Sequence, residues 1–293
     1  MSKFVEQFHG KEGNTENAYS VLLRTFDPNE IYVVGSIAGL AYLDSKNNFL
    51  KGTVFPDVAH DTSHDHDLDI LIKNENLSKL LQLLPFVKES YPLHKITYKW
   101  GMLEEIHLPF KNYKLKSNEE IDIFVGSVCA IPANENTYKI EGNVVYKGFS
   151  LNAPEKSFIF ATYINPLAIT EARVNRFFIL ATDEYAKNGE EQLKVKIADA
   201  VYYVALGKLR VDDKKEELKN TDPYNPILSE ESFINYSKKF EEELPRIIES
   251  RRPKLIRMAK HSGFNEFDTE RTATIVINGI REYPEILKDV RRK

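Results

Sequence analysis

The spacing of apolar residues divides the chain into two parts. Up to about residue 150, short apolar runs alternate with polar stretches, a pattern typical of strands and short helices joined by turns. Beyond that point, apolar residues recur every three or four positions over long stretches, which indicates helices. The sequence therefore predicts an α+β fold, with a mixed-sheet domain at residues 1–150 and an α-helical domain at residues 151–293.

The first part contains several runs that favour strands. We expect strands at residues 31–35, 68–73, 94–100 and 120–126, and a hairpin at residues 136–148 that turns around Glu141-Gly142-Asn143. Residues 36–43 suit a short helix that Ser36 would cap, and residues 75–85 a second helix that ends at Pro85.

The second part is expected to be helical almost throughout. Its first helix would begin with Asn152 as the cap and Pro154 in the first turn. Further helices are predicted at about 166–187, 190–209, 229–243, 245–261 and 266–292.

Composition indicates an ordinary folded protein. Of 293 residues, 42% are hydrophobic and 29% are charged, so the chain can form a normal core. The net charge of −4 gives no overall attraction to nucleic acid or acidic lipid, and the single cysteine, Cys129, excludes an internal disulfide. No stretch resembles a signal peptide or reaches the roughly 18 apolar residues of a membrane helix. We therefore expect a cytoplasmic protein that does not enter membranes.

A Gly-Ser dipeptide stands between the first expected strand and helix. The amino terminus of a helix offers unpaired N–H groups and a partial positive charge, which suit phosphate oxygens. Gly35 would let the backbone approach such a ligand, and the Ser36 hydroxyl would add a hydrogen bond. Many ordinary turns also contain Gly-Ser, so the dipeptide alone does not define a site.

Two aspartates stand where the second expected strand begins. In "SHDHDLDILIK" (63–73), strand periodicity places Asp67 and Asp69 on one face, and Leu68 on the other. Two carboxylates at this spacing can share a divalent cation such as Mg²⁺, which prefers oxygen ligands. The alternative is a solvated acidic turn. Asp65 and Asp67 also form an Asp-x-Asp pair, but the apolar run follows Asp69 directly, which favours Asp67 and Asp69.

A third acid interrupts an apolar strand. Asp122 lies between Ile121 and Ile123 in "EIDIFV", and burying an unpaired carboxylate is costly. Asp122 must therefore face a cation, a metal or water, the last if this is an edge strand.

These three segments resemble the nucleotidyltransferase superfamily with the DNA polymerase β-like fold. "VVGSIAGLAYL", "DLDILI" and "IDIFV" match its pattern of Gly-Ser before a helix, Asp-x-Asp opening a strand, and a third acid on a neighbouring strand. The match covers roughly residues 30–126, and the size and helical second part look more like the AbiEii-type toxins than the small antitoxin-like members. One departure is the long segment between Ser36 and Asp67, which is much shorter in most members.

The resemblance implies a mixed sheet with flanking helices and a two-metal reaction. Asp67, Asp69 and Asp122 would hold two Mg²⁺ ions, for which Mn²⁺ can substitute, and Gly35 and Ser36 would hold the β and γ phosphates. An NMP would pass from a nucleoside triphosphate, ATP among them, to a hydroxyl group on RNA, a protein or a small molecule, and pyrophosphate would leave.

Other charged residues have functional and structural interpretations. Lys208 and Arg210 are candidates for binding the triphosphate, or they belong to a solvated helix surface. The same alternatives apply to Arg173 and Arg176 and to the basic run at residues 251–260, which is a candidate RNA contact. His60, His64 and His66 form either a metal-binding loop or an exposed one near the acids.

Three functions agree with this sequence. The first is a Mg²⁺-dependent nucleotidyltransferase. The second is an inactive nucleotide-binding or regulatory protein on the same scaffold, and the third is a metal-dependent phosphohydrolase that uses the His/Asp loop.

Overall fold

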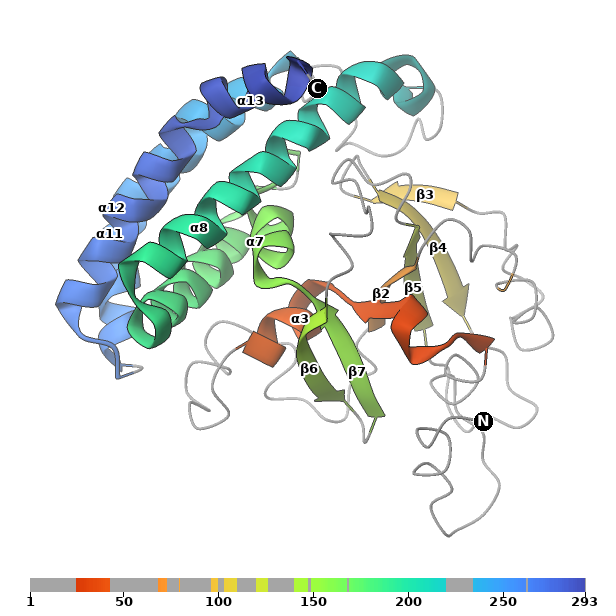
Figure 1. Ribbon diagram of the computed structural model, residues 1–293, viewed down its shortest axis with the longest axis horizontal. Coiled ribbons are helices and arrows are strands. Elements are labelled where there is room, and N and C mark those ends of the chain that lie inside the picture. The colour runs from red at the N-terminus through yellow and green to blue at the C-terminus, as the bar shows by residue number, and fades with distance from the viewer. Residues whose placement is uncertain are drawn as a thin grey trace, which may run out of the picture.

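The computed structural model describes most of the second part of the chain and the strands of the first. The described residues are 25–42, 68–72, 79, 96–99, 103–109, 120–125, 140–146, 149–167, 169–219, 234–261 and 263–292. They form a sheet region and a group of long helices, with one short helix, α7 (Lys156–Ile164), between the two (Figure 1).

A five-stranded sheet occupies the first part of the chain. Its strand order is β1-β2-β5-β4-β3. Only β2 and β5 are parallel, and the other neighbouring strands are antiparallel. The strand bounds are Ile31–Val33 for β1, Leu68–Ile72 for β2, Ile96–Lys99 for β3, Leu103–Pro109 for β4 and Glu120–Val125 for β5.

Four of these strands lie where apolar runs predict them, and β4 was not expected. Its sequence, "LEEIHLP", carries two adjacent glutamates and alternates only over its second half. Strand β4 pairs with β3 on one side, where Lys99 faces Leu103, and with β5 on the other. Its own residues alternate too weakly to reveal the strand.

A separate hairpin follows the sheet, and its turn is not where the sequence suggests. Strand β6 (Ile140–Tyr146) runs straight through Glu141, Gly142 and Asn143 and pairs with β7 (Phe149–Pro154). The pairing register shifts between Ile140 and Gly142, so the glycine marks a bulge instead of a turn. The prediction of a turn at 141–143 is therefore wrong, and the strands connect through residues 147–148.

The second part begins differently from the prediction. Asn152 and Pro154 belong to strand β7, and α7 starts only at Lys156, with Glu155 at its cap position. The Asn152 amide instead donates a hydrogen bond of 2.9 Å to the Pro28 carbonyl, which ties β7 to the short 3₁₀ helix at Pro28–Glu30. Its side chain therefore stabilises a tertiary contact and caps no helix.

Helix α8 (Glu171–Lys219) contains the two helices that were expected at 166–187 and 190–209. It begins at Glu171, later than predicted, because Thr170 accepts a hydrogen bond from the Arg173 N–H and so caps it. At Gly189 the backbone leaves helical geometry, with φ 82° and ψ −179°. The predicted interruption at this point is confirmed, because glycine adopts this conformation without strain.

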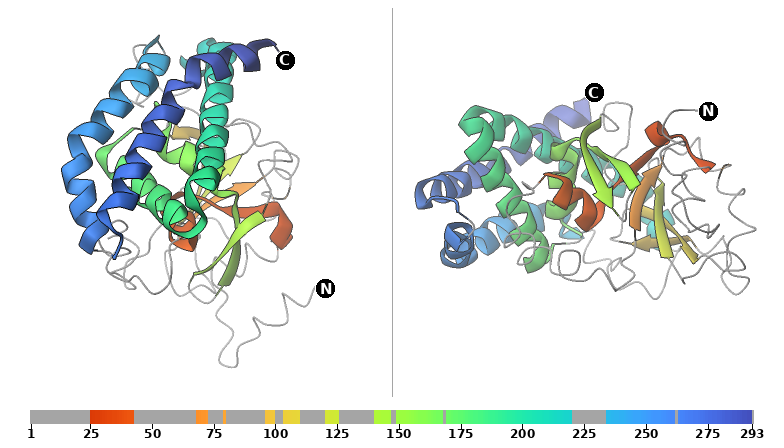
Figure 2. Two further views of the ribbon diagram at one scale, coloured as in Figure 1. Left: turned by 60° about the vertical axis from the view of Figure 1, so that its left-hand side comes forward. Right: turned by 90° about the horizontal axis from the view of Figure 1, so that it is seen from below.

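The remaining helices pack against α8 (Figure 2). A short helix α10 (Tyr236–Lys238) passes through a π-helical turn at Lys239–Glu243 into α11 (Leu244–His261). The helices predicted at 229–243 and 245–261 thus form one continuous segment, in which the widened turn accommodates the missing N–H of Pro245. The predicted helix at 266–292 is two helices, α12 (Glu266–Arg281) and α13 (Tyr283–Arg292), because Pro284 begins a new helix more easily than it continues one.

The buried apolar residues of the described segments form one cluster that reaches from the sheet into the helices. It includes Val33 of β1, Ile70 of β2, Phe160 of α7 and Phe177 of α8, all fully buried. Helices α8 and α12 approach so closely that a Cβ added at Gly279 would overlap the Cγ2 atom of Ile197. The division into domains 1–150 and 151–293 stays a prediction. No helix in the described parts of the chain is both long and apolar enough to cross a lipid bilayer.

Candidate functional site

The Gly-Ser segment forms a turn from β1 into a helix. Helix α3 (Gly35–Tyr42) starts directly after Val34, and Gly35 has φ 64°, a conformation that favours glycine. The Ala38 N–H bonds to the Val34 carbonyl at 3.4 Å, so Ser36 lies inside the first turn of the helix. The helix thus begins one residue before the predicted 36–43, and the capping role of Ser36 stays a prediction, because its side chain is not described.

This turn is held in place by the second part of the chain. The Tyr163 hydroxyl of α7 donates a hydrogen bond of 2.8 Å to the Gly35 carbonyl, and Tyr163 is almost fully buried. The hydroxyl of Tyr42, at the other end of α3, donates to the Pro154 carbonyl. Both ends of α3 are thus fixed by residues more than a hundred positions away, which no local sequence pattern reveals.

The sheet register places two of the three predicted acids side by side. Asp69 and Asp122 are direct partners on the parallel strands β2 and β5. Paired positions of neighbouring strands share a face of the sheet and lie about 4.8 Å apart. The structure therefore brings these two positions together, as convergence on a common cation requires.

The Gly35 turn reaches the same end of the sheet as this pair. Strand β1 is antiparallel to β2, and its last residue, Val33, pairs with Ile70. The chain beyond Val33 continues past the start of β2, where Asp69 lies. Gly35, Asp69 and Asp122 therefore occupy one end of the sheet.

Several predicted residues lie outside the described segments or lack a described side chain. Asp67 directly precedes the first described residue of β2, and His60, His64 and His66 fall in the same segment outside the described residues. The backbones of Ser36, Asp69, Asp122 and Arg210 are described, but their side chains are not. The roles predicted for all of these residues stay predictions. Within the described side chains, no group of three His, Cys, Asp or Glu residues could hold a metal ion.

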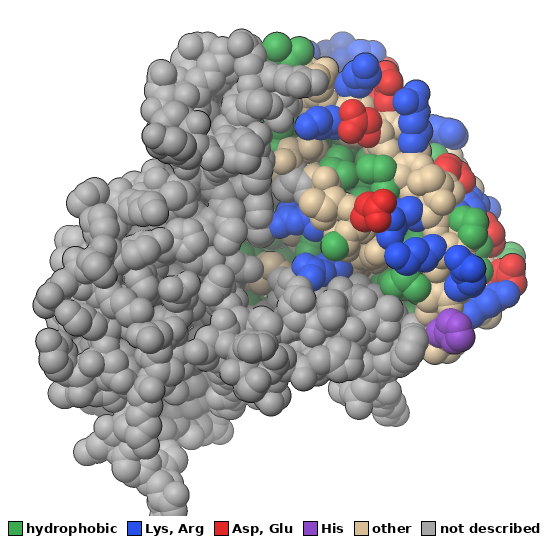
Figure 3. Space-filling model, turned by 180° about the vertical axis from the view of Figure 1, so that it is seen from behind, with side chains coloured by type: hydrophobic (Ala, Val, Ile, Leu, Met, Phe, Trp, Pro, Cys, Tyr) green, Lys and Arg blue, Asp and Glu red, His purple; other side chains and the backbone are tan. Residues whose placement is uncertain are grey.

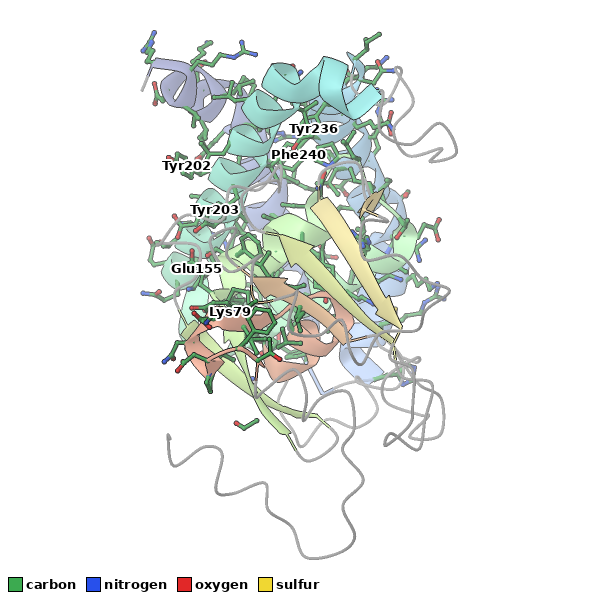
Figure 4. All side chains as sticks on the ribbon, turned by 90° about the vertical axis from the view of Figure 1, so that its right-hand side faces the viewer. Lys79, Glu155, Tyr202, Tyr203, Tyr236 and Phe240 are labelled. Atoms are coloured by element: carbon green, nitrogen blue, oxygen red, sulfur yellow. The ribbon has the colours of Figure 1, made fainter. Side chains whose placement is uncertain are left out.

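Lys208, the other predicted triphosphate contact, has partners inside the helical part. It lies on α8 and forms an ion pair with Asp212, one helical turn further on. Its Nζ atom also lies 5.9 Å from the centre of the Tyr236 ring. Figure 4 shows Tyr236 beside Phe240. It also shows Tyr203 next to Glu155, and the Tyr203 hydroxyl donates a hydrogen bond to the Glu155 carboxylate. Phosphate binding by Lys208 would compete with Asp212.

Three more of the predicted cations form contacts between helices. The Arg173 Nη1 atom donates to the Thr162 carbonyl of α7 at 3.2 Å. In the basic run at 251–260, Arg251 pairs with Glu171 and Arg252 with Glu249 and Glu270. On the helical surface in Figure 3, Lys and Arg side chains alternate with Asp and Glu. These pairings favour the structural interpretation of the run over RNA binding.

Strand β4 adds one residue that sequence reasoning missed. Its position His107 pairs with Asp122 of β5. The available signal was a histidine between the apolar residues Ile106 and Leu108, but it had no meaning until β4 was known to be a strand beside β5.

Comparisons with known proteins give only distant likenesses. No protein-family model matches the chain, and no curated protein matches it. Among solved structures, a candidate nucleotidyltransferase from Helicobacter pylori is 12% identical, with 92% of this chain and 94% of that chain covered and a TM-score of 0.28. The protein JHP933 from Helicobacter pylori is 10% identical, with 94% and 99% covered and a TM-score of 0.29. TM-scores this low carry neither fold nor activity from those proteins to this one.

Proposed function

We propose that the protein is a metal-dependent nucleotidyltransferase, which transfers an NMP group from a nucleoside triphosphate to a hydroxyl acceptor. The observation that carries this proposal is the register of the sheet. It pairs Asp69 with Asp122 at the end of the sheet where the Gly35 turn begins α3. Both a cation site and a phosphate site are then available at one place.

The residues at this place fit Mg²⁺. Magnesium in proteins is usually bound by one or two carboxylates together with substrate phosphates. Asp69 and Asp122 would supply those carboxylates, and Asp67, two residues before Asp69, would supply a third. When bound, the metal ions stabilise negative charge on the attacking and leaving oxygens.

The phosphates would lie against the start of α3. Backbone N–H groups in the first turn of a helix have no partner within the helix, and they attract anions. The positive φ of Gly35 turns the backbone into the helix without a side chain in the way. Gly35 and the Ser36 hydroxyl would thus bind the β and γ phosphates and leave the α phosphate toward the acids.

The reaction is a displacement at the α phosphorus. The acceptor hydroxyl oxygen forms a bond to the α phosphorus, and the bond from this phosphorus to the oxygen bridging to the β phosphate breaks. Pyrophosphate leaves with that electron pair. The acceptor proton passes to a carboxylate, for which we propose Asp122, because its strand β5 lies between β2, which carries Asp69, and β4.

The test is to incubate the protein with each of the four α-labelled nucleoside triphosphates, Mg²⁺ and RNA, protein or small-molecule acceptors. We expect label to pass to an acceptor, with pyrophosphate released in equal amount. Asp67→Asn, Asp69→Asn and Asp122→Asn should each reduce the rate by on the order of 10²-fold or more, as loss of a charge-stabilising group does. Asp289→Asn, an exposed residue of α13, is the matched control and should keep full activity.

Other outcomes contradict the proposal. Binding of nucleotide without pyrophosphate release would indicate a regulatory nucleotide-binding protein. Release of orthophosphate without an acceptor would indicate a phosphohydrolase. Undiminished transfer by Asp67→Asn would remove Asp67 from the site.

A further inference from the structure

The two paired aspartates belong to a row of three positions. His107 of β4 pairs with Asp122 of β5, and Asp122 pairs with Asp69 of β2. The three strands are adjacent in the order β2-β5-β4, so the row crosses the sheet without a gap. Since paired positions share a face, all three positions lie on the same face of the sheet.

The rows on both sides of this one are entirely apolar. The neighbouring row that contains Ile70 has an isoleucine on each of the three strands, and the neighbouring row that contains Leu68 has leucine or isoleucine on each. These flanking rows are Ile70–Ile123–Ile106 and Leu68–Ile121–Leu108. Because successive residues of a strand point to opposite faces of the sheet, these apolar rows lie on the other face. Two aspartates and one histidine, both residue types that bind metals, thus share one row on the face opposite them.

The spacing of the row suits a single cation. Neighbouring strands lie about 4.8 Å apart, so the outer positions Asp69 and His107 are each one strand away from the central Asp122. The row therefore sets two aspartate positions and one histidine position beside one another on three neighbouring strands. Metal sites in proteins commonly combine these two ligand types.

We infer that His107 is a nitrogen ligand of the metal site formed with Asp69 and Asp122, and that the site therefore prefers Mn²⁺ to Mg²⁺. This inference rests on the proposed function, because it concerns the same metal site. Mg²⁺ takes oxygen ligands and tolerates little else, whereas imidazole suits transition metals. One nitrogen ligand would therefore shift the preference of an otherwise carboxylate site.

The direct test is pulsed electron paramagnetic resonance of Mn²⁺ bound to the full chain. A histidine nitrogen bound to Mn²⁺ produces a ¹⁴N modulation, which disappears when the histidines are labelled with ¹⁵N. We expect this modulation in the wild type. We also expect its loss in His107→Gln and its retention in His261→Gln, a matched control on an exposed residue at the end of α11.

Affinity gives a second, independent readout. Calorimetric titration with Mn²⁺ and with Mg²⁺ should show tighter Mn²⁺ binding by the wild type. Loss of a residue that only hydrogen-bonds to a metal ligand typically weakens metal binding by about 10–100-fold. Loss of a direct ligand in His107→Gln should weaken Mn²⁺ binding by at least as much, with a much smaller change for Mg²⁺. His261→Gln should change neither constant.

The outcomes separate the inference from the proposed function. Mn²⁺ bound without nitrogen modulation in the wild type would overturn the role of His107, even if His107→Gln does not fold, and would leave the transferase standing. Equal loss of both metals in a folded His107→Gln variant would also overturn it. No binding of either metal, with or without a nucleoside triphosphate, would overturn both proposals.

Discussion

Tyr163 connects the helical part of the protein to the turn at Gly35. Its hydroxyl donates to the Gly35 carbonyl at 2.8 Å in a buried environment, 128 residues away in sequence. Gly35 must hold a positive φ for the chain to enter α3, and a hydrogen bond to its carbonyl fixes the orientation of the adjoining peptide. The phosphate-binding turn of the proposed site thus depends on a tyrosine outside the sheet.

Replacing this tyrosine tests that dependence. Tyr163→Phe removes the hydrogen bond and should reduce the free energy of unfolding by about 1 kcal/mol, measured by urea denaturation. Because the turn loses its fixed orientation, the KM for the nucleoside triphosphate should also rise.

A matched control separates stability from function. The Tyr236 hydroxyl donates to the Val204 carbonyl at 3.0 Å, also buried, but within the helical part. Tyr236→Phe should lower stability by a similar amount and leave KM unchanged. Equal KM changes in the two variants would show that Tyr163 acts on folding alone.

At the residue scale, the sequence alone identifies the acids of the candidate site, but not the residues that lie next to the site in the fold. Asp69 and Asp122 are conspicuous because each adjoins apolar strand residues, where a carboxylate needs a reason. His107 and Tyr163 have no such local signal. Their relation to the site exists only through the pairing of β4 with β5 and the packing of α7 on α3.

At the scale of elements, prediction succeeded where the determining interactions are local. The strands β1, β2, β3 and β5 follow apolar runs, and the interruption in α8 follows Gly189. Strand β4 was missed because its residues alternate over only half its length, and β7 because Asn152 and Pro154 are also typical of the start of a helix. The turn-like Glu141-Gly142-Asn143 proved to be a bulge within β6, because pairing with β7 outweighs local turn preference.

Helices α8 and α12 are joined by an ion pair that predicts a pH dependence. The Nε and Nη2 atoms of Arg271 donate to the two carboxylate oxygens of Glu190, each at 2.8 Å. These bonds, with a further one from Lys194, lower the pKa of Glu190 from 4.5 to about 2. Since the folded-state pKa lies below the unfolded value, the stabilising effect is present above about pH 4.5 and is lost as the pH falls toward 2.

The measurement is a pH titration of the Glu190 carboxyl carbon by NMR. We expect a midpoint near 2 in the wild type and a higher midpoint in Arg271→Gln, which stays below 4.5 because Lys194 still bonds to Glu190. Lys288→Gln removes an ion pair with Glu285 inside α13 and should leave the Glu190 midpoint unchanged. A wild-type midpoint near 4.5 would contradict the paired geometry.

At the scale of the whole molecule, the sequence anticipated a sheet followed by helices but not how the two parts join. Helix α7 lies between them and is buried along its whole length, Lys156 and Ser157 included. Lys156 pairs with Glu184 of α8, and its Nζ atom lies 5.2 Å from the centre of the Tyr42 ring of α3. Lysine is rarely buried unless it is paired, so a core predicted from apolar residues does not include Lys156. The contacts of this junction therefore become visible only in the folded structure.

The Glu184 carboxylate is central to this junction. Burial raises the pKa of Glu184, but hydrogen bonds from Lys156 and Asn188 and the charge of Lys156 together lower it by more. The net pKa therefore lies below the ordinary value, and the group stays ionised. Glu184→Ala would leave the buried Lys156 ammonium without this partner, and removing one member of a buried pair typically costs about 3–5 kcal/mol. Glu191→Ala, which removes a highly exposed partner of Lys194, is the control and should cost under about 1 kcal/mol.

Two spectroscopic signals can show whether the junction couples the two parts. Trp100, the only tryptophan of the sequence, belongs to residues 1–150, so its fluorescence is a probe of that part of the chain, while circular dichroism at helical wavelengths reports mainly on α8 and its neighbours. Because the described core is continuous from β1 to α8, both signals should follow one urea transition in the wild type. Both should move to the same lower midpoint in Glu184→Ala. Two separate transitions, with only the helical one shifted, would mean that residues 1–150 and 151–293 unfold as independent domains.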